Sequence, residues 1–156
     1  NGVAAGAGLA LAMACDIRIA AENAWLFPGY SRIGGSPDGG LSWTLPQAIG
    51  YEKAMRFLLE NKRVDPAEAL SLGLIGEIVP DDQFEARFAE YCQSLTTISP
   101  IAARLTKRVV REATKIDIEA QVRYELQTIG TAFASEDGQE SRRAFLERRK
   151  PEIKGR

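Results

Sequence analysis

The sequence predicts an α/β protein whose front half combines short strands with helices and whose back half consists of long amphipathic helices. Three observations support this prediction. A glycine-rich loop, NGVAAGAG, runs directly into a stretch of small residues with helical character. Short apolar or alternating runs, bounded by glycine and proline, follow as far as Pro80. Beyond that point every pattern has helical periodicity.

The first elements of the front half are predicted from alternating apolar and polar side chains and from the glycines that end an element. After the opening helix, residues 16–20 alternate between apolar and polar side chains and predict a short strand. Residues 25–27 predict a second strand. A glycine-rich turn over residues 34–40 then leads to a helix over residues 41–49, which Gly50 ends.

Two further helices and a strand complete the front half. Residues 51–61 predict an amphipathic helix whose apolar face consists of Ala54, Met55, Leu58 and Leu59. Asp65 and Pro66 form a strong helix start, an N-cap followed by proline, and this helix ends at Gly73. Residues 74–79 predict a strand that Pro80 stops.

The back half predicts helices throughout. Residues 84–95 carry one apolar stripe, made of Phe84, Phe88, Tyr91, Cys92 and Leu95. Ser99 and Pro100 begin another helix, and residues 116–134 and 136–149 form the last two. We therefore expect two parts, residues 1–80 and a helical region over residues 81–156. Long helices appended to a small α/β core suggest that this region makes subunit contacts.

Composition excludes several classes of function. The 156 residues, 45% of them hydrophobic, suffice for a globular core, and 20 basic against 21 acidic residues give no reason to expect a nucleic-acid partner. The chain has no histidine, which excludes a histidine-dependent triad or a histidine-ligated metal built from this chain alone. No membrane span or signal peptide is visible. Cys15 and Cys92 match no metal spacing; we expect free, buried thiols, which suit a cytoplasmic location.

The opening loop could bind an anion. Gly6, Ala7 and Gly8 have little or no side chain, and the helix that follows brings unpaired backbone N–H groups and the positive end of its dipole to this point. Such a point also stabilises an oxygen on which negative charge develops. The spacing matches neither the dinucleotide nor the P-loop fingerprint. The alternative is a tightly packed helix start that binds nothing.

Asp38 is the strongest candidate for chemistry in the chain. It lies in IGGSPDGG, a turn flanked by glycines and followed by the apolar residues Leu41 and Trp43. A carboxylate held among apolar groups is suited to taking and returning a proton near neutral pH. The alternative is structural, because Pro-Asp-Gly is also a common β-turn sequence and Asp38 could cap the following helix.

Four segments of the chain resemble the crotonase, or enoyl-CoA hydratase/isomerase, superfamily. They are NGVAAGAGLALAMACDIRIAAENA, IGGSPDGGLSWTLPQAIG, RVDPAEALSLGLIGEIVP and AFLERRKPEIKG. The resemblance covers essentially the whole chain and corresponds to the C-terminal part of that fold. It implies a crotonase-like spiral of ββα units, followed by helices that build homotrimers or hexamers. It also implies an acyl-CoA thioester substrate and no cofactor, and it places the family's first oxyanion donor before Asn1.

The resemblance also assigns roles to individual residues. The backbone N–H that stabilises the thioester oxygen corresponds to that of Ala7. The two glutamates with which hydratases activate water correspond to Ala10 and Tyr30, neither of which can serve. Asp38 falls where isomerases and aromatic dehalogenases of the family keep a catalytic aspartate. The pattern around Asp38, with Trp43 five residues on, is more similar to the isomerase branch.

The expected function is therefore a double-bond shift in an acyl-CoA of fatty-acid metabolism. Asp38 and the Ala7 amide are the expected catalytic groups; residues expected to bind substrate are Gly6, Gly8, Tyr30, Gly35, Pro37, Trp43 and Lys150. Lys150 belongs to a basic tail that could meet CoA phosphates or simply be solvated. The alternatives are a hydratase, an aryl-CoA dehalogenase and a non-catalytic acyl-CoA-binding module.

Overall fold

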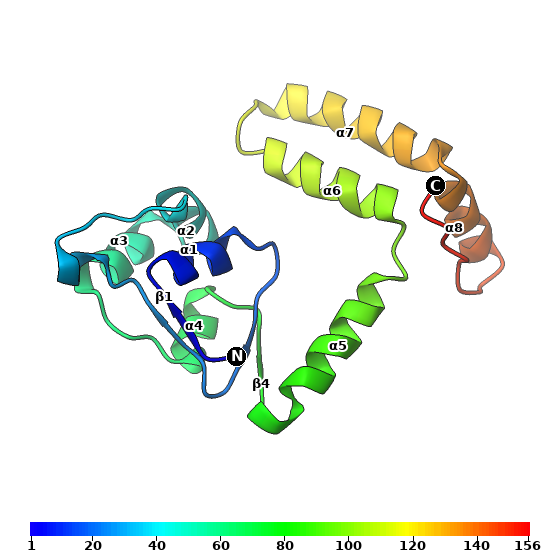
Figure 1. Cartoon of the computed structure of the whole chain (residues 1–156). Helices are drawn as coiled ribbons and strands as arrows, with labels where there is room; N and C mark the ends of the chain where they lie inside the picture. Colours follow the sequence, from blue (N-terminus) through cyan, green and yellow to red (C-terminus); the bar gives the residue numbers. More distant parts are fainter. The chain divides into compact units, whose positions relative to one another are not determined.

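The computed structural model describes all residues from 1 to 156 and contains two compact units, Asn1–Ala89 and Glu90–Arg156 (Figure 1). The boundary between them falls inside one helix, α5 (Phe84–Leu95), nine residues beyond the division expected at Pro80. No helix is both long enough and apolar enough to cross a membrane.

The strands of the first unit form two small parallel sheets. β1 (Val3–Ala5) pairs with β3 (Trp25–Phe27), and β2 (Ile19–Ala21) pairs with β4 (Glu77–Val79). The strand over residues 25–27 is confirmed. β1 was not expected, because three small residues between glycines carry no alternation.

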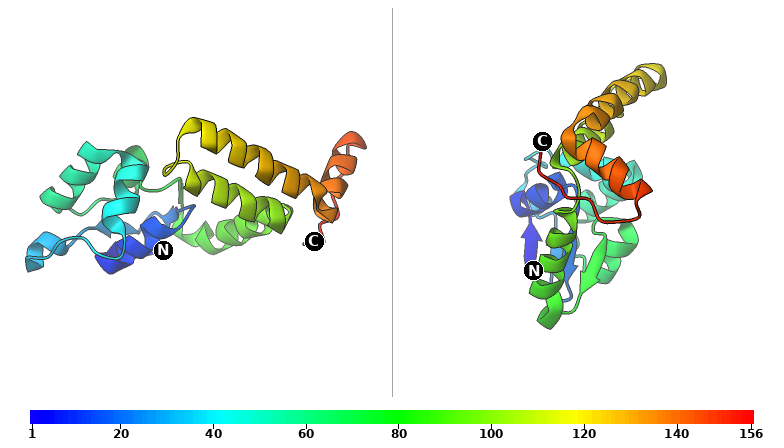
Figure 2. Two further views of the ribbon diagram at one scale, coloured as in Figure 1. Left: turned by 90° about the horizontal axis from the view of Figure 1, so that it is seen from above. Right: turned by 90° about the vertical axis from the view of Figure 1, so that its right-hand side faces the viewer.

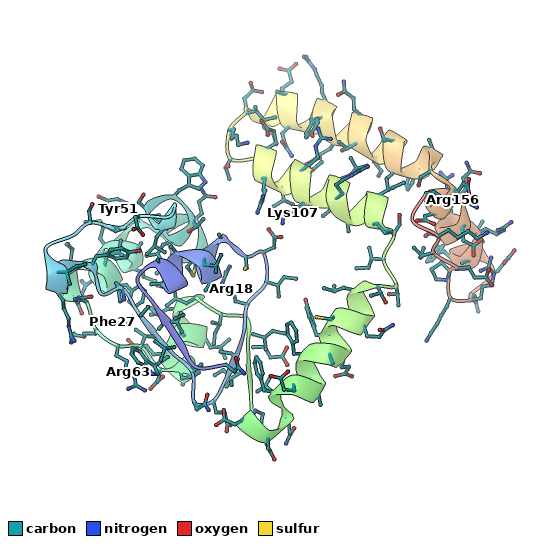
Figure 3. The ribbon with its side chains drawn as sticks, viewed as in Figure 1. Arg18, Phe27, Tyr51, Arg63, Lys107 and Arg156 are labelled. Atoms are coloured by element: carbon teal, nitrogen blue, oxygen red, sulfur yellow. The ribbon has the colours of Figure 1, made fainter.

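Arg18 explains why β2 begins later than the alternation predicts. Its side chain, labelled in Figure 3, donates to the carbonyl groups of Leu74 at 2.6 Å and Cys15 at 2.7 Å. The approach to β2 is therefore held by the Arg18 side chain and by one backbone hydrogen bond, from the Gly76 N–H to the Arg18 carbonyl at 2.9 Å. β4 is also shorter than expected, because the Leu74 N–H closes the end of the preceding helix on the carbonyl of Ala69 at 2.8 Å.

Four α-helices pack around these strands: α1 (Ala7–Ala14), α2 (Leu41–Ile49), α3 (Tyr51–Glu60) and α4 (Pro66–Leu72). The predicted bounds of α2 and α4 are confirmed, and the Asp65 side chain caps α4 by accepting from the Glu68 N–H at 2.8 Å. The predicted face of α3 is partly wrong. Ala54 and Phe57 are buried there, whereas Met55 and Leu59 are exposed.

The core of this unit lies between α1, α2 and the strands. Leu9, Leu41, Leu45 and Leu74 are fully buried in it. At its edge the Arg63 guanidinium lies 4.3 Å from the ring centre of Trp25, a cation–π contact at the side chain labelled in Figure 3. Two short 3-10 turns, Tyr30–Ile33 (η1) and Asp81–Gln83 (η2), complete the unit.

The second unit is helical, as predicted. α6 (Pro100–Glu112) and α7 (Ile118–Ala134) run antiparallel and side by side, and α8 (Glu136–Leu146) follows (Figures 1 and 2). Side chains of Ser99, Asp117 and Ser135 cap the three helices at their N-termini.

The expectation for the cysteines is wrong in one respect. Both are free, but Cys15 and Cys92 are exposed and not buried. Cys15 follows the end of α1, and Cys92 lies on α5, none of whose residues is buried. The apolar stripe predicted for α5 is therefore only partly covered: Phe84 and Tyr91 are half-buried, whereas Phe88, Cys92 and Leu95 are exposed.

The C-terminal tail returns along α8, as Figure 1 shows. Asp137, which is 1% exposed, fixes it there. Its carboxylate accepts from the backbone N–H groups of Lys154 at 2.7 Å and Gly155 at 2.8 Å, and its own N–H donates to the carbonyl of Arg156 at 2.8 Å. The N–H donors of Lys154 and Gly155 hold the pKa of the Asp137 carboxyl below its ordinary value of 3.8.

Acid should therefore loosen the second unit through Asp137. Because the pKa is lower in the folded state, its stabilisation is present above about pH 4 and is lost as the pH falls through the folded value. We expect Asp137→Asn to lower the melting temperature by several degrees at pH 7 and to flatten its fall below pH 4. Thermal unfolding across pH, with the exposed Asp82→Asn as control, measures this. Equal pH dependence of both variants would contradict it.

A pair of glycine substitutions tests the packing of α8 on α7. A Cβ at Gly138 would lie 2.0 Å from the carbonyl oxygen of Ala132, so Gly138→Ala should lower the free energy of unfolding by about 1–3 kcal/mol. A Cβ at Gly130, inside α7, would meet nothing within 4 Å. Gly130→Ala should raise the free energy of unfolding by roughly 0.5–1 kcal/mol, because alanine favours the helix more than glycine does. Denaturant unfolding followed by circular dichroism compares the two, and a stable Gly138→Ala variant would refute the contact.

Candidate functional site

The candidate site lies where the paired strands β1 and β3 both end. Ala5 and Phe27 are the last pair in the register, and the Gly6 N–H donates to the Phe27 carbonyl at 3.1 Å. Because the strands are parallel, the segments that leave them emerge at the same edge of the sheet. One segment becomes α1 and the other becomes η1, so the start of α1 and Tyr30 are brought together. Ligands of α/β proteins commonly bind at such an edge.

Gly6 makes the abrupt turn from β1 into α1. Its φ of 51° with ψ of −119° is a backbone conformation that side-chain-bearing residues rarely adopt. No side chain caps the helix and its first turn has no acidic residue. The N–H groups of Ala7 and Gly8 open the helix, where the helical ladder has no acceptor for them, and both residues are exposed. This end of α1 has the geometry of a site for a negatively charged oxygen, and that role stays a prediction.

Asp38 and Tyr30 are in direct contact. The Tyr30 hydroxyl donates to Oδ1 of Asp38 at 2.8 Å, and the tyrosine is buried whereas the aspartate is exposed. Burial raises the pKa of Tyr30, and the hydrogen bond to Asp38 raises it further. The hydroxyl therefore keeps its proton and acts as a donor.

The backbone around Tyr30 holds its side chain in place. Gly29 and Gly34 flank η1 with left-handed φ values of 80° and 69°. The Gly29 N–H donates to the Asn61 side chain at 2.7 Å, and the Gly35 N–H donates to the Tyr30 carbonyl at 3.0 Å. Tyr30 was expected among the pocket-lining residues, so its direct partnership with Asp38 is new.

Two expectations about Asp38 need correction. Its side chain does not cap α2, because Gly40 is the N-cap and no side chain bonds there; only the Asp38 carbonyl accepts, from the Leu41 N–H at 3.0 Å. The structural alternative of a capping aspartate is therefore wrong. The enclosing apolar pocket is also not formed by these 156 residues, because Asp38 is exposed.

Ala10 lies directly beneath the Asp38 turn. It is 2% exposed, and a Cβ placed on Gly39 would stand only 3.0 Å from the Ala10 Cβ. Ala10 and Tyr30 occupy the positions of the two hydratase glutamates. Ala10 thus lies against Gly39, the residue after Asp38, and Tyr30 bonds to Asp38 itself. The three positions singled out by the resemblance form one cluster.

The remaining predicted site residues differ in their placement. Gly35 and Pro37 belong to the same turn as Asp38, and Trp43 lies on α2 with 60% of its surface exposed. Lys150 is exposed and belongs to the second unit, after α8, so its role stays a prediction.

Sequence reasoning missed Asn61. It ends α3 with a left-handed φ of 53°, and its side chain anchors Gly29, one residue before Tyr30. Asparagine is one of the few residues that favour this helix-ending conformation, and that preference was the available signal. No group of three or more histidine, cysteine, aspartate or glutamate residues in the structure could hold a metal ion.

Comparison with known proteins identifies the family of this chain. The family model described as enoyl-CoA hydratase/isomerase matches residues 1–156. A probable enoyl-CoA hydratase from Rhodobacter capsulatus is 36% identical over 100% of this chain and 61% of its own length.

Solved structures share the fold. The enoyl-CoA hydratase of Bacillus anthracis has a TM-score of 0.95 at 32% identity, over 100% of this chain and 60% of that one. A probable enoyl-CoA hydratase/isomerase of Mycobacterium abscessus has a TM-score of 0.93 at 31% identity, over 100% and 61%.

The chain spans about three fifths of the length of these relatives. Its fold is crotonase-like α/β, mostly helical with small parallel sheets, and enzymes of this family need no cofactor. The match over every residue, together with the structural similarity, shows that the chain belongs to the enoyl-CoA hydratase/isomerase family, the crotonase superfamily.

Proposed function

We propose that this chain carries the proton-transfer machinery of an enzyme that shifts a double bond in an acyl-CoA thioester. The observation that carries the proposal is the Asp38 carboxylate, held by the Tyr30 hydroxyl at 2.8 Å, in a turn whose next residue, Gly39, lies against Ala10. The family resemblance puts Asp38 where isomerases keep a catalytic aspartate. The two positions that correspond to the water-activating glutamates of hydratases hold an alanine and a tyrosine.

From this chain, the mechanism uses one base and one oxyanion donor. With a 3-enoyl-CoA, the Asp38 carboxylate takes a proton from C2, and the electron pair moves onto the thioester oxygen. The Ala7 N–H, at the positive end of α1, stabilises that negative charge. Asp38 then returns the proton to C4. The double bond moves from C3–C4 to C2–C3, with no net gain or loss of atoms.

Hydration of an enoyl-CoA is the second candidate, because named relatives such as the probable enoyl-CoA hydratase of Rhodobacter capsulatus are hydratases. Addition of water requires a group that positions and activates the water. Ala10 cannot titrate, and the Tyr30 hydroxyl is already committed as a donor to Asp38. This arrangement favours isomerisation over hydration.

Asp38→Asn is the decisive substitution. It keeps the size of the side chain and removes the base, so isomerisation of a 3-enoyl-CoA should fall by about 10²–10⁴-fold in kcat. The readout is formation of the conjugated 2-enoyl product by the whole protein across a series of acyl-chain lengths. The exposed Asp82→Asn serves as the matched control.

Four outcomes separate the candidates. Full activity of Asp38→Asn would remove Asp38 from the mechanism. Water addition to a 2-enoyl-CoA at a rate above isomerisation would favour the hydratase. A covalent aryl adduct on Asp38 with a halo-aryl-CoA, detected by mass spectrometry, would favour the dehalogenase. Acyl-CoA binding without deuterium exchange at C2 or C4 would favour the non-catalytic module.

We also propose that the helices of the second unit build a homotrimer or a pair of trimers, and that the protein is cytoplasmic. A groove of about 560 Å³ lies between α6 and α7 and is lined mainly by aliphatic side chains. Large apolar side chains of this unit are exposed, among them Val110, Ile118, Val122, Leu126, Ile129, Phe133, Phe145 and Leu146. Burial of such a surface in an interface is favourable. Lys150, in the adjoining tail, is proposed to bind CoA phosphates.

A single charge should test this assembly. Leu126 is 67% exposed and borders the groove, so Leu126→Glu should move the protein from trimer or hexamer to monomer. Gln127→Glu places the same charge one residue away, on another face of α7, and should leave the assembly intact. Light scattering after size-exclusion chromatography gives the mass. A wild-type monomer, or equal masses for both variants, would contradict the proposal.

A further inference from the structure

We propose that Tyr30 is a positioning residue for Asp38, holding its Oδ1 so that Oδ2 is the oxygen that takes and returns the proton. This inference rests on the proposed function, because it concerns the same proton transfer. Tyr30 touches the carboxylate and is not proposed to touch the reacting atoms.

The two carboxylate oxygens of Asp38 differ in their hydrogen bonding. Oδ1 accepts from the Tyr30 hydroxyl at 2.8 Å, whereas Oδ2 accepts from no group of this chain. A carboxylate with one oxygen occupied presents the other in a defined direction. Proton abstraction depends on that direction, because a misplacement of about 1 Å can cost a factor of 10² in rate.

The two partners differ in how firmly the fold holds them. Tyr30 is 9% exposed, and backbone hydrogen bonds fix the residues on both sides of it. Asp38 is exposed and its side chain bonds to no residue other than Tyr30. The orientation of the Asp38 carboxylate is therefore set by Tyr30. The tyrosine is fixed in the core, and its hydroxyl bonds to a side chain on an exposed turn.

A phenol suits this role because it stays a neutral donor. Burial and the neighbouring carboxylate both raise the pKa of Tyr30, so the hydroxyl keeps its proton throughout the neutral range. Tyr30 is the titratable group that the structure places in contact with Asp38. Phenylalanine would fill the same space without the donor.

The test compares Tyr30→Phe, Asp38→Asn and the double variant in the whole protein. Tyr51→Phe is the matched control, because Tyr51 is 74% exposed and lies outside the site. With a 3-enoyl-CoA, Tyr30→Phe should lower kcat by roughly 10–100-fold while KM changes less than about twofold. The double variant should lose no more than Asp38→Asn alone.

A second substitution keeps the test valid if Tyr30→Phe fails to fold. Placing 3-fluorotyrosine at position 30 keeps the ring and the hydroxyl donor, so kcat should stay close to that of the wild type. A loss of kcat with this variant, in which the donor is kept, would contradict the inference.

The outcomes distinguish this inference from the proposed function. If Asp38→Asn is inactive while Tyr30→Phe matches Tyr51→Phe in kcat and KM, the role of Tyr30 is overturned and the proposed function stands. If Asp38→Asn keeps its activity, or the wild type has none, both fall. An additive loss in the double variant would show that Tyr30 acts independently of Asp38, which also overturns the inference.

Discussion

The hydrogen bond between the Gly6 N–H and the Phe27 carbonyl is the constraint on which the candidate site depends. It continues the pairing of β1 with β3 by one step and sets the start of α1 beside the exit from β3. Every later feature of the site follows from that juxtaposition. A slip of the parallel register would separate the Ala7 amide from the turn that carries Tyr30 and Asp38.

In the proposed mechanism, the two strands supply different halves of the chemistry. β1 leads to a helix N-terminus, which would contribute main-chain dipoles and needs no particular side chain beyond a small one. β3 leads to a buried tyrosine and, eight residues later, to the exposed carboxylate that we propose as the base. Under this proposal, the backbone stabilises charge at the oxygen, whereas the outcome of the reaction depends on side chains that can be exchanged without altering the strands.

Helices were predicted better than strands, because the residues that cap a helix stand next to it in the sequence. Asp65, Ser99 and Gly50 mark their helix ends as capping preferences require. β1 has no such signal, since its pairing with β3 is a long-range event between residues more than twenty positions apart. Asp38 could be singled out from its turn and from the family resemblance. Its bond to Tyr30 could not, because it depends on how left-handed glycines direct η1.

The exposure of Asp38 has a related origin. Apolar neighbours in sequence suggested a pocket, but Leu41 turns into the core while Trp43 faces outward on the same helix. Apolar residues that are neighbours in the sequence therefore do not form one apolar surface here. Helical geometry separates residues two positions apart by about half a turn.

Because both tryptophans lie in one unit, the tryptophan fluorescence of this protein comes from that unit alone. Trp25, stacked under Arg63, and Trp43, exposed on α2, both belong to the first unit, and the second unit has none. Indole emission therefore monitors the loss of structure around the site alone, while the circular dichroism of the peptide groups reports on the helices of both units. Comparing the two signals during unfolding reveals whether the two units melt together or one after the other.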